Sequence, residues 1–250
     1  MIVSISFVLV YSTISLSSSV SHKTSSYINK LSRTSTSNTL MPYDDFKGST
    51  YSLGLGETSP NKKWYNEYTG YGVTGVEKDP ITGNHYFYEE PKISTSPNQT
   101  HASLVITTKN YSSFDMTLDM NTVKQLRQNS TPNPWETAWV LWHYTDDFHT
   151  YAFYLKPTGF QIEKKDNNNR NDSAQIYLLD GDTPKLKMGQ WSKVRISMVG
   201  IHIRVWVNGA NIADFYDKIP NSPRMSSGAM GLYNEDSSVR FDNVYITRLG

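Results

Sequence analysis

Apolar and polar residues alternate along several short segments of the chain. In the clearest case Phe114, Met116, Leu118 and Met120 share one side of residues 114–120 and polar residues share the other. Side chains of a strand point alternately to opposite faces, so this period of two predicts strands with one buried face. The same pattern predicts further strands at 102–108, 137–144, 151–156, 160–164, 194–198 and 202–207. No useful stretch has the helical period, so we predict an all-β protein with two stacked antiparallel sheets.

Residues 54–100 depart from this pattern. They are rich in Gly, Pro and Asn and carry several Tyr residues and one Trp, Trp64. A long irregular segment inside a compact domain usually packs on itself or carries function. We therefore expect an irregular segment whose aromatic rings either close one end of the sandwich or line a ligand cleft.

Motifs near both ends of the chain carry a family resemblance. Residues 226–233 read SSGAMGLY and lead to VRFDNVYI at 239–246, while 43–48 read YDDFKG. The segments WSKVRI and VWVNG, at 191–196 and 205–209, add a hairpin between them. Together they resemble the D-x-F-x-G opening, the hairpin and the closing strands of concanavalin A-like lectins and glucanases. The LamG-like and 3-keto-disaccharide hydrolase-like branches are the ones most similar.

The resemblance implies a fold and a domain division. It predicts one concanavalin A-like jelly-roll sandwich over residues 42–250, with the two ends of the domain paired in one sheet. A chain of 250 residues is long enough for one large β-domain of this kind.

Composition narrows the range of partners. The net charge is +1, from 24 Lys and Arg against 23 Asp and Glu, so the basic stripe that nucleic acid requires is not indicated. The chain has no Cys, which excludes disulfides as the source of stability. Tyr, Phe and Trp are abundant, as expected of strands and also of ligand-stacking surfaces.

The first residues indicate export. Residues 2–16 are uncharged and mostly apolar but too short to span a bilayer, so we predict a signal peptide over 1–21 and no membrane span in the mature chain. An uncleaved anchor is the alternative. Residues 22–41, rich in Ser and Thr, are predicted to be a flexible linker. The domain is therefore expected to be a monomer that is secreted or held at the cell surface. Potential glycosylation sites follow at Asn98, Asn110, Asn129 and Asn171.

Two neighbouring predicted strands offer a candidate ligand surface. Alternation turns Trp139 and His143 to one side of the first strand, and Tyr154 and Lys156 to one side of the next. Asp119 lies on the polar side of an earlier strand. Aromatic rings combined with directional polar groups are what sugar recognition requires. We therefore predict a lectin-like module that binds a polysaccharide on this face, with an ordinary solvated sheet face as the alternative.

The sequence lacks the pair of carboxylates that the glucanase mechanism requires on one strand. The glucanase branch carries E-x-D-x-x-E on one strand, which sets two carboxyls about 5 Å apart. The corresponding strand here has only Glu136, at its edge. A glycoside hydrolase remains open if the fold brings Asp119 or Asp146 close to Glu136. A polysaccharide lyase is a weaker alternative, since residues 154–159 faintly resemble the Y-x-K-x-G strand of alginate lyases, in which a Tyr is the acid or base and a His, here His143, assists it. A structural surface protein is the third possibility.

The resemblance also implies a structural calcium ion. In the glucanase-like branch a cation lies where the first and last strands meet, held by a carboxylate of the terminal strand and carbonyl oxygens near the opening motif. Asp242 matches the first position, and Asp45 and Gly48 match the second. A carboxylate that only accepts backbone hydrogen bonds is the alternative for Asp242.

Overall fold

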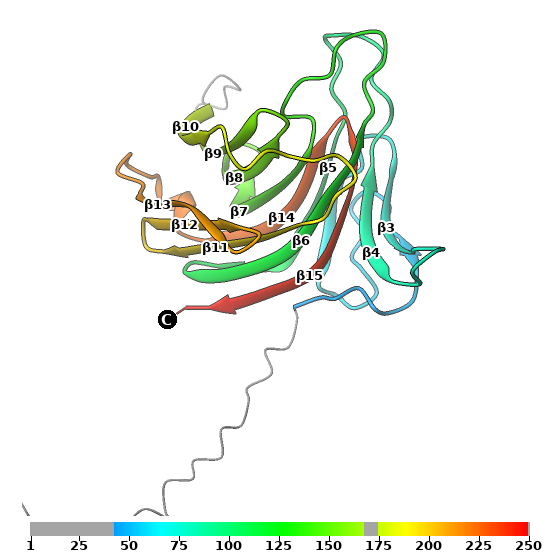
Figure 1. The fold of residues 1–250 in the computed structure, drawn as a ribbon. Coiled ribbons are helices and arrows are strands. Elements are labelled where there is room, and N and C mark those ends of the chain that lie inside the picture. Colours follow the sequence, from blue (N-terminus) through cyan, green and yellow to red (C-terminus); the bar gives the residue numbers. More distant parts are fainter. Residues whose placement is uncertain (1–42, 168–174, 250) are drawn as a thin grey trace, which may run out of the picture. The chain divides into compact units, whose positions relative to one another are not determined.

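Two antiparallel sheets face each other in the computed structural model, which describes residues 43–167 and 175–249 (Figure 1). The described residues contain one short 3-10 helix, η2 (Pro223–Ser226), and no α-helix. No helix in this part of the chain is long and apolar enough to cross a bilayer. The all-β, two-sheet prediction is confirmed. The predicted signal peptide 1–21, the predicted linker 22–41 and Asn171 lie outside the described residues.

The two sheets contain eight and seven strands. The eight-stranded sheet has the order β1 (Tyr51–Ser52), β3 (Val73–Lys78), β4 (His85–Glu90), β15 (Ser237–Arg248), β6 (Phe114–Gln125), β11 (Ser192–Val199), β12 (His202–Val207) and β13 (Ala210–Tyr216). The seven-stranded sheet has the order β10 (Gln175–Gly181), β9 (Gly159–Asp166), β8 (His149–Lys156), β7 (Ala138–Asp146), β14 (Gly228–Glu235), β5 (Ala102–Tyr111) and β2 (Trp64–Tyr68). Consecutive strands such as β14 and β15 belong to different sheets, as in a jelly roll.

The core lies between the sheets and is built by the alternation seen in the sequence. Phe114, Met116 and Leu118 on β6 are fully buried, as are Val140 on β7 and Phe153 on β8. Burying one such side chain stabilises the fold by roughly 1.5–3 kcal/mol. The aromatic strand β7 occupies the middle of its sheet, so its outward side is flanked by strands on both edges.

The segment 54–100 is more regular than its composition suggested. It contains β2, β3 and β4, and it contributes strands to both sheets. Trp64 is fully buried and stacks on Phe46 and Phe87, with ring centroids 5.9 and 6.3 Å away. Tyr68, by contrast, lies on the outward face of its sheet. On the same strand, Trp64 thus packs in the interior of the sandwich, whereas Tyr68 is available to line a ligand site.

The two ends of the described domain meet, as predicted. The Asp44 amide donates to the Val244 carbonyl at 3.0 Å, and the Val244 amide donates back at 2.8 Å. The buried Asp44 carboxylate also accepts hydrogen bonds from Trp64 Nε1 at 2.9 Å and from Asn61 Nδ2 at 2.8 Å. The D-x-F-x-G segment therefore fastens the first strands to the last one.

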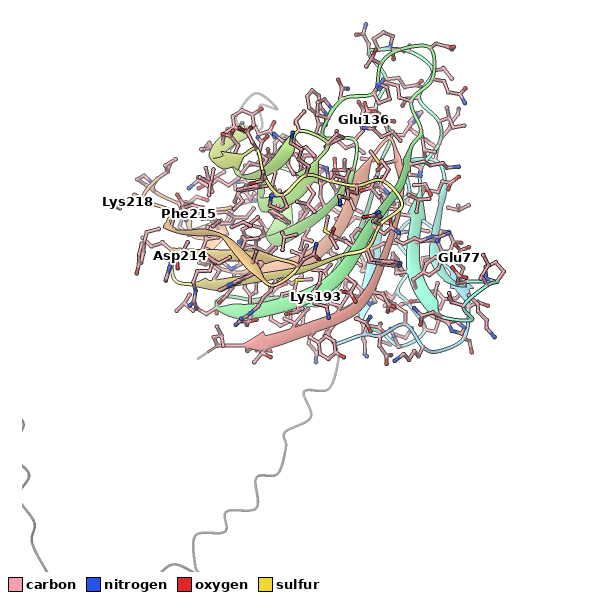
Figure 2. The ribbon with its side chains drawn as sticks, in the orientation of Figure 1. Glu77, Glu136, Lys193, Asp214, Phe215 and Lys218 are labelled. Carbon is pink, nitrogen blue, oxygen red and sulfur yellow. The ribbon has the colours of Figure 1, made fainter. Side chains whose placement is uncertain are left out.

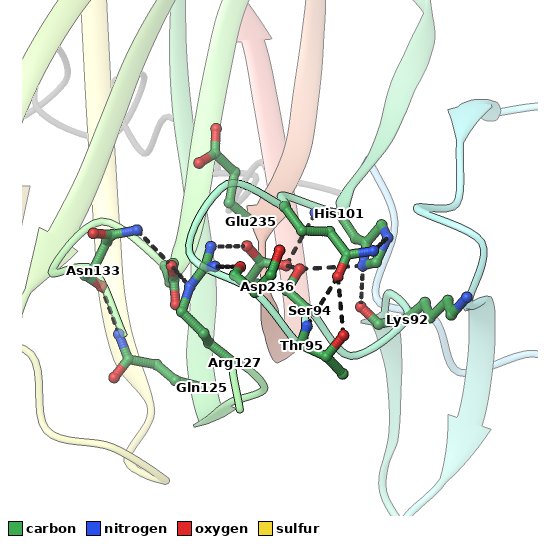
Figure 3. A network of polar contacts seen from close by, with 12 residues as sticks. Lys92, Ser94, Thr95, His101, Gln125, Arg127, Asn133, Glu235 and Asp236 are labelled. Carbon is green, nitrogen blue, oxygen red and sulfur yellow. Dashed lines mark hydrogen bonds and ion pairs between the residues drawn. The ribbon is translucent and has the colours of Figure 1, made fainter. Parts of the chain in front are cut away.

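A buried polar network closes one end of the sandwich (Figure 3). The Arg127 guanidinium donates to Glu136 Oε1 and to Asp236 Oδ2, both at 2.6 Å. Asp236 Oδ1 in turn accepts the Ser94 hydroxyl and the His101 amide. Glu136, the lone carboxylate of the sequence argument, is therefore committed to a buried ion pair.

A second buried carboxyl has no cation. Glu89 on β4 is fully buried between the sheets, where Asn234 Nδ2 donates weakly to it at 3.4 Å and its Oε1 has no hydrogen-bond partner. Burial raises the pKa of Glu89 well above its ordinary value. Because the pKa of Glu89 is higher in the folded state than in the unfolded state, its contribution to the free energy of unfolding is most favourable below the unfolded-state pKa. That contribution is lost as pH rises through the folded-state pKa.

Replacing Glu89 by glutamine should therefore stabilise the protein near neutral pH. Glutamine mimics the protonated acid and removes the cost of keeping a proton on a buried carboxyl. Thermal melts at a series of pH values should show an advantage over wild type at about pH 7 that disappears at about pH 4. Glu90→Gln, an adjacent change at a surface ion pair with Lys124, is the control and should show no such trend. A Glu89→Gln curve parallel to wild type would contradict the expectation.

Candidate functional site

The outward face of the seven-stranded sheet carries a groove of about 770 Å³. This volume falls within the range of small-molecule sites, about 300–1,000 Å³. The groove is lined by aromatic residues, carboxyls and lysines, among them Tyr68, Trp135, Trp139, Tyr144, Asp147, Tyr154, Lys156, Gln161, Glu163, Lys165, Tyr177, Asp180, Tyr233 and Glu235.

Strand register brings the floor residues into one line across the sheet. Gln161 on β9 lies opposite Tyr154 on β8, which lies opposite Trp139 on β7, which lies opposite Tyr233 on β14. Residues in direct register across antiparallel strands have Cβ atoms about 4.5–5.5 Å apart, so their side chains pack. The groove floor is therefore an aromatic row of Tyr154, Trp139 and Tyr233, with Gln161 at one end, and backbone pairing sets its order.

The two central rings of this row pack on each other. Trp139 and Tyr154 stack with centroids 3.7 Å apart and planes at 17°, and Tyr233 meets Trp139 edge-on at 5.3 Å. Trp139 is 6% exposed and Tyr154 only 3%. Each ring thus covers a face of the other, so these residues form a floor and present edges and polar atoms to a ligand.

Lys156 reaches the groove beside this row. Its Nζ donates to Gln161 Oε1 at 2.7 Å and lies 6.0 Å from the Tyr154 ring centroid. Of the five residues expected to form the ligand surface, Trp139, Tyr154 and Lys156 are brought together.

A buried carboxyl lies at the floor of the groove. Glu163 on β9 is 2% exposed. It accepts hydrogen bonds from the Tyr154 hydroxyl at 2.9 Å, from Gln161 Nε2 at 3.1 Å and from Gln175 Nε2. Burial raises the pKa of Glu163, and the hydrogen bonds and nearby lysines oppose this only in part. These three hydrogen-bond donors are all uncharged.

A second carboxyl faces the groove from β14. Glu235 accepts the Tyr233 hydroxyl at 2.6 Å. Burial raises the pKa of Glu235, and the neighbouring Asp236 and Glu163 add to the effect. Figure 3 shows the Glu235 carboxyl turned away from Arg127, whereas Asp236 next to it points towards Arg127. Glu163 and Glu235 are thus each hydrogen-bonded by a tyrosine of the aromatic row.

His143 does not reach the groove, contrary to the sequence prediction. A bulge in β7 shifts the register after Trp142, and His143 there has φ 53°. The imidazole is buried, with its two nitrogens 2.8 Å from the carbonyl oxygens of Met225 and Ser112. An extra residue in a bulge inverts the alternation that follows it. Tyr144 therefore takes the outward position that simple alternation gave to His143.

Asp119 does not reach the groove either. It belongs to β6 in the eight-stranded sheet, where it pairs with Asp242 in register and accepts Asn243 Nδ2 at 2.9 Å. Its ion-pair partner Lys193 lies on β11 of that sheet (Figure 2). Alternation correctly predicted that Asp119 faces outward, but periodicity along one strand cannot tell which of two sheets that strand joins.

The calcium prediction at Asp45, Gly48 and Asp242 stays a prediction. Asp242 accepts hydrogen bonds from Asn84 Nδ2 and from the Asn243 amide, while Asp45 pairs with Lys47 at 3.6 Å and Gly48 is exposed. Among the described residues no three His, Cys, Asp or Glu side chains gather into a metal-binding group. Calcium takes six to eight oxygen ligands, so it would depend largely on carbonyl oxygens beside Asp242.

Chelation tests this site. A ligand bound only by the native state stabilises it, so excess chelator should lower the melting temperature of wild type. Asp242→Asn should melt at the same temperature with and without chelator. An unchanged melting temperature of the wild-type protein after exhaustive chelation would show that no calcium ion stabilises the fold.

The sequence pattern did not reveal Glu163 and Glu235 or the two exposed rings, Trp135 and Tyr177, as groove residues. Glu163 lies in a predicted strand, and its period-two relation to Gln161 marks both as outward-facing. Tyr177 and Trp135 are 64% and 42% exposed at the groove. Trp135 precedes a strand and Tyr177 lies beyond a polar run, so periodicity gave no signal for either. At the predicted glycosylation sites, Asn98, Asn110 and Asn129 are exposed.

The chain belongs to the family of 3-keto-alpha-glucoside-1,2-lyase-like domains, whose pattern it matches over residues 56–247. This is one of the branches that the closing strands suggested. A search of curated proteins found no significant match.

Solved structures support the same fold. The carbohydrate-binding module CBM66 from Bacillus subtilis is 13% identical, with a TM-score of 0.51 over 74% of this chain and 94% of that one. The exoplasmic/lumenal domain of VIP36, in a form bound to Ca²⁺ and Man3GlcNAc, is 9% identical, with a TM-score of 0.51 over 81% of this chain and 91% of that one. At these identities the likeness shows the fold. The concanavalin A-like jelly roll is thereby confirmed. The matched family supports a sugar-binding or hydrolase-like role.

Proposed function

We propose that the protein binds a saccharide in the groove of the seven-stranded sheet. The observation that carries this proposal is the aromatic row with a tyrosine-bonded carboxyl at each side, Glu163 and Glu235. Sugars present apolar C–H faces and many hydroxyls, and such a surface offers apolar edges together with hydrogen-bond acceptors. The family and the carbohydrate-binding neighbours support a glycan as the partner.

A glycan array is the first test. Wild-type protein should bind a defined subset of glycans, and the hits should then be assayed in parallel for new reducing ends and for unsaturated products. Binding without turnover supports a lectin-like module, and turnover supports an enzyme. If the wild-type protein binds no glycan, either with or without calcium, the proposal of saccharide binding is wrong and a structural surface role is left.

A sugar-cleaving enzyme is the second candidate, and the pair Glu163 and Glu235 favours it. Glu136 alone could not supply two carboxyls, but the groove contains another pair whose raised pKa values keep a proton available at higher pH than usual. General acid–base catalysis needs one group to take a proton and another to protonate the departing oxygen. Either hydrolysis or the elimination indicated by the family name would use two such groups.

The enzyme candidate makes its own prediction. Glu163→Gln and Glu235→Gln should each lower turnover by at least about 100-fold, as expected for loss of a general acid or base. Glu77→Gln is the matched control, because Glu77 also accepts a tyrosine hydroxyl, from Tyr86 at 2.6 Å, but lies on β3 away from the groove (Figure 2). Turnover that survives both groove substitutions would exclude this pair as the acid and base.

We also propose that the protein is exported, on the basis of its amino-acid sequence. The apolar segment 2–16 and three exposed sequons support a secreted or surface-held domain. Intact-mass measurement on protein from its native host should show loss of residues 1–21, with added glycan mass if the host glycosylates. A full-length, unmodified chain in the cytoplasm would refute it.

A further inference from the structure

The open aromatic faces of the groove belong to two residues outside the central row. Trp139 and Tyr154 cover each other and are nearly buried, so neither offers a free ring face. Trp135 and Tyr177 line the same groove with 42% and 64% of their surface exposed. An exposed indole or phenol beside polar groups is suited to pack on the C–H face of a pyranose ring.

Both rings are held by the fold next to the polar floor. The Trp135 carbonyl accepts Trp139 Nε1 at 2.7 Å and the Thr137 amide at 2.8 Å, which fixes the turn that carries it. Tyr177 on β10 lies directly opposite Glu163 on β9. The backbone positions of both residues are therefore set by the fold, which lowers the entropy cost of binding.

The charges of the groove select among sugars. Four carboxyls face it, from Asp147, Glu163, Asp180 and Glu235, and none of the described residues that line it is an arginine. Of the three lysines that line it, Lys156 is bonded to Gln161 and Lys164 is held in a buried ion pair with Asp217. Carboxylate oxygens accept hydrogen bonds from hydroxyls but repel a ligand carboxylate or sulfate.

The lysine next to these carboxyls does not reverse this selection. Lys165 also lines the groove, and its charge partly offsets the rise that burial causes in the pKa values of Glu163 and Glu235. A uronate or sulfated ligand would therefore meet a lysine already close to acidic partners and several further acidic oxygens.

We propose that Trp135 and Tyr177 form an aromatic clamp on an uncharged oligosaccharide, each ring packing on a different sugar unit along the groove, and that the groove discriminates against uronate and sulfated glycans. This inference rests on the proposed saccharide binding and adds the residues and the ligand class. The floor residues would orient hydroxyls, while the two exposed rings would supply most of the apolar contact.

The test compares ring removals inside and outside the groove. Titrations would use neutral oligosaccharides of glucose, mannose and xylose, and as charged probes oligosaccharides of galacturonate and guluronate. Trp135→Ala and Tyr177→Ala should each weaken binding of the best neutral probe by about tenfold or more, and Tyr177→Phe should retain it. Trp191→Ala and Tyr216→Ala are the controls, since these rings are 42% and 57% exposed but do not line the groove.

The outcomes separate the clamp from the saccharide site itself. Neutral binding that is lost in Glu163→Gln but unchanged in both alanine variants would overturn the clamp and leave the groove assignment standing. Uronate bound as tightly as the neutral probe would overturn the ligand class. A wild-type protein that binds none of the neutral probes would overturn the clamp together with the proposed function.

Discussion

Replacing Arg127 by methionine should lower the free energy of unfolding by about 3–5 kcal/mol, the cost of breaking a buried charge pair. The Arg127 side chain is 1% exposed and pairs with Glu136 and Asp236, whose side chains are also buried. Nη1 of the same guanidinium also donates to the Ser96 carbonyl. Removing the cation leaves two carboxylates without a counter-charge where water cannot solvate them.

Arg195→Met is the matched control for Arg127→Met. Arg195 pairs with Asp115 at the same 2.6 Å, but its side chain is 48% exposed on the eight-stranded sheet. An exposed pair contributes at most about 1 kcal/mol, so urea unfolding should separate the two variants clearly. Equal losses of stability would contradict the assignment of Arg127 as the cation that holds this end of the sandwich.

Glu163→Gln should weaken saccharide binding by roughly 10- to 150-fold, which corresponds to a hydrogen bond to a charged group of about 1.5–3 kcal/mol. Glutamine keeps the shape but offers one acceptor oxygen in place of two. Burial raises the pKa of Glu163 above its ordinary value of 4.5, so the carboxyl gains its charge only as pH rises through that raised pKa.

The pH dependence of this variant gives a sharper check. Wild-type affinity should increase as pH rises through the raised pKa of Glu163, and the variant should lack that increase, so the two should converge in acid. Calorimetric titration of one array hit across pH measures this, with Glu77→Gln as the control that should follow wild type. Parallel pH curves for wild type and Glu163→Gln would exclude Glu163 as a ligand contact.

Local alternation predicted the strands well because each strand buries one face, which requires apolar residues at every second position of its own sequence. The predicted strand 202–207 coincides with β12, and the alternate residues Phe114, Met116, Leu118 and Met120 point into the core as expected. The motifs at the two ends predicted their meeting, seen in the pairing of Asp44 with Val244. These features depend on neighbours in sequence or on a motif that specifies its partner.

The site was harder to predict because it depends on which strands become neighbours. Trp139, Tyr154 and Lys156 were found because β7 and β8 are joined by a short turn and pair in register. Asp119 was misplaced because β6 joins the other sheet, and His143 because one bulged residue inverts the alternation. Glu235 follows a recognisable G-x-x-G-L-Y strand, yet its place beside Tyr233 in the groove emerges only when β14 pairs with β7.

The most direct test of the central claim is a crystal structure with the best array hit soaked or co-crystallised. We predict density for a sugar ring in the groove of the seven-stranded sheet, above the row of Tyr154, Trp139 and Tyr233, with a hydroxyl within hydrogen-bond distance of Glu163. Ordered sugar on the outward face of the eight-stranded sheet, or only at the loops, with the groove unoccupied at saturating ligand, would contradict the account.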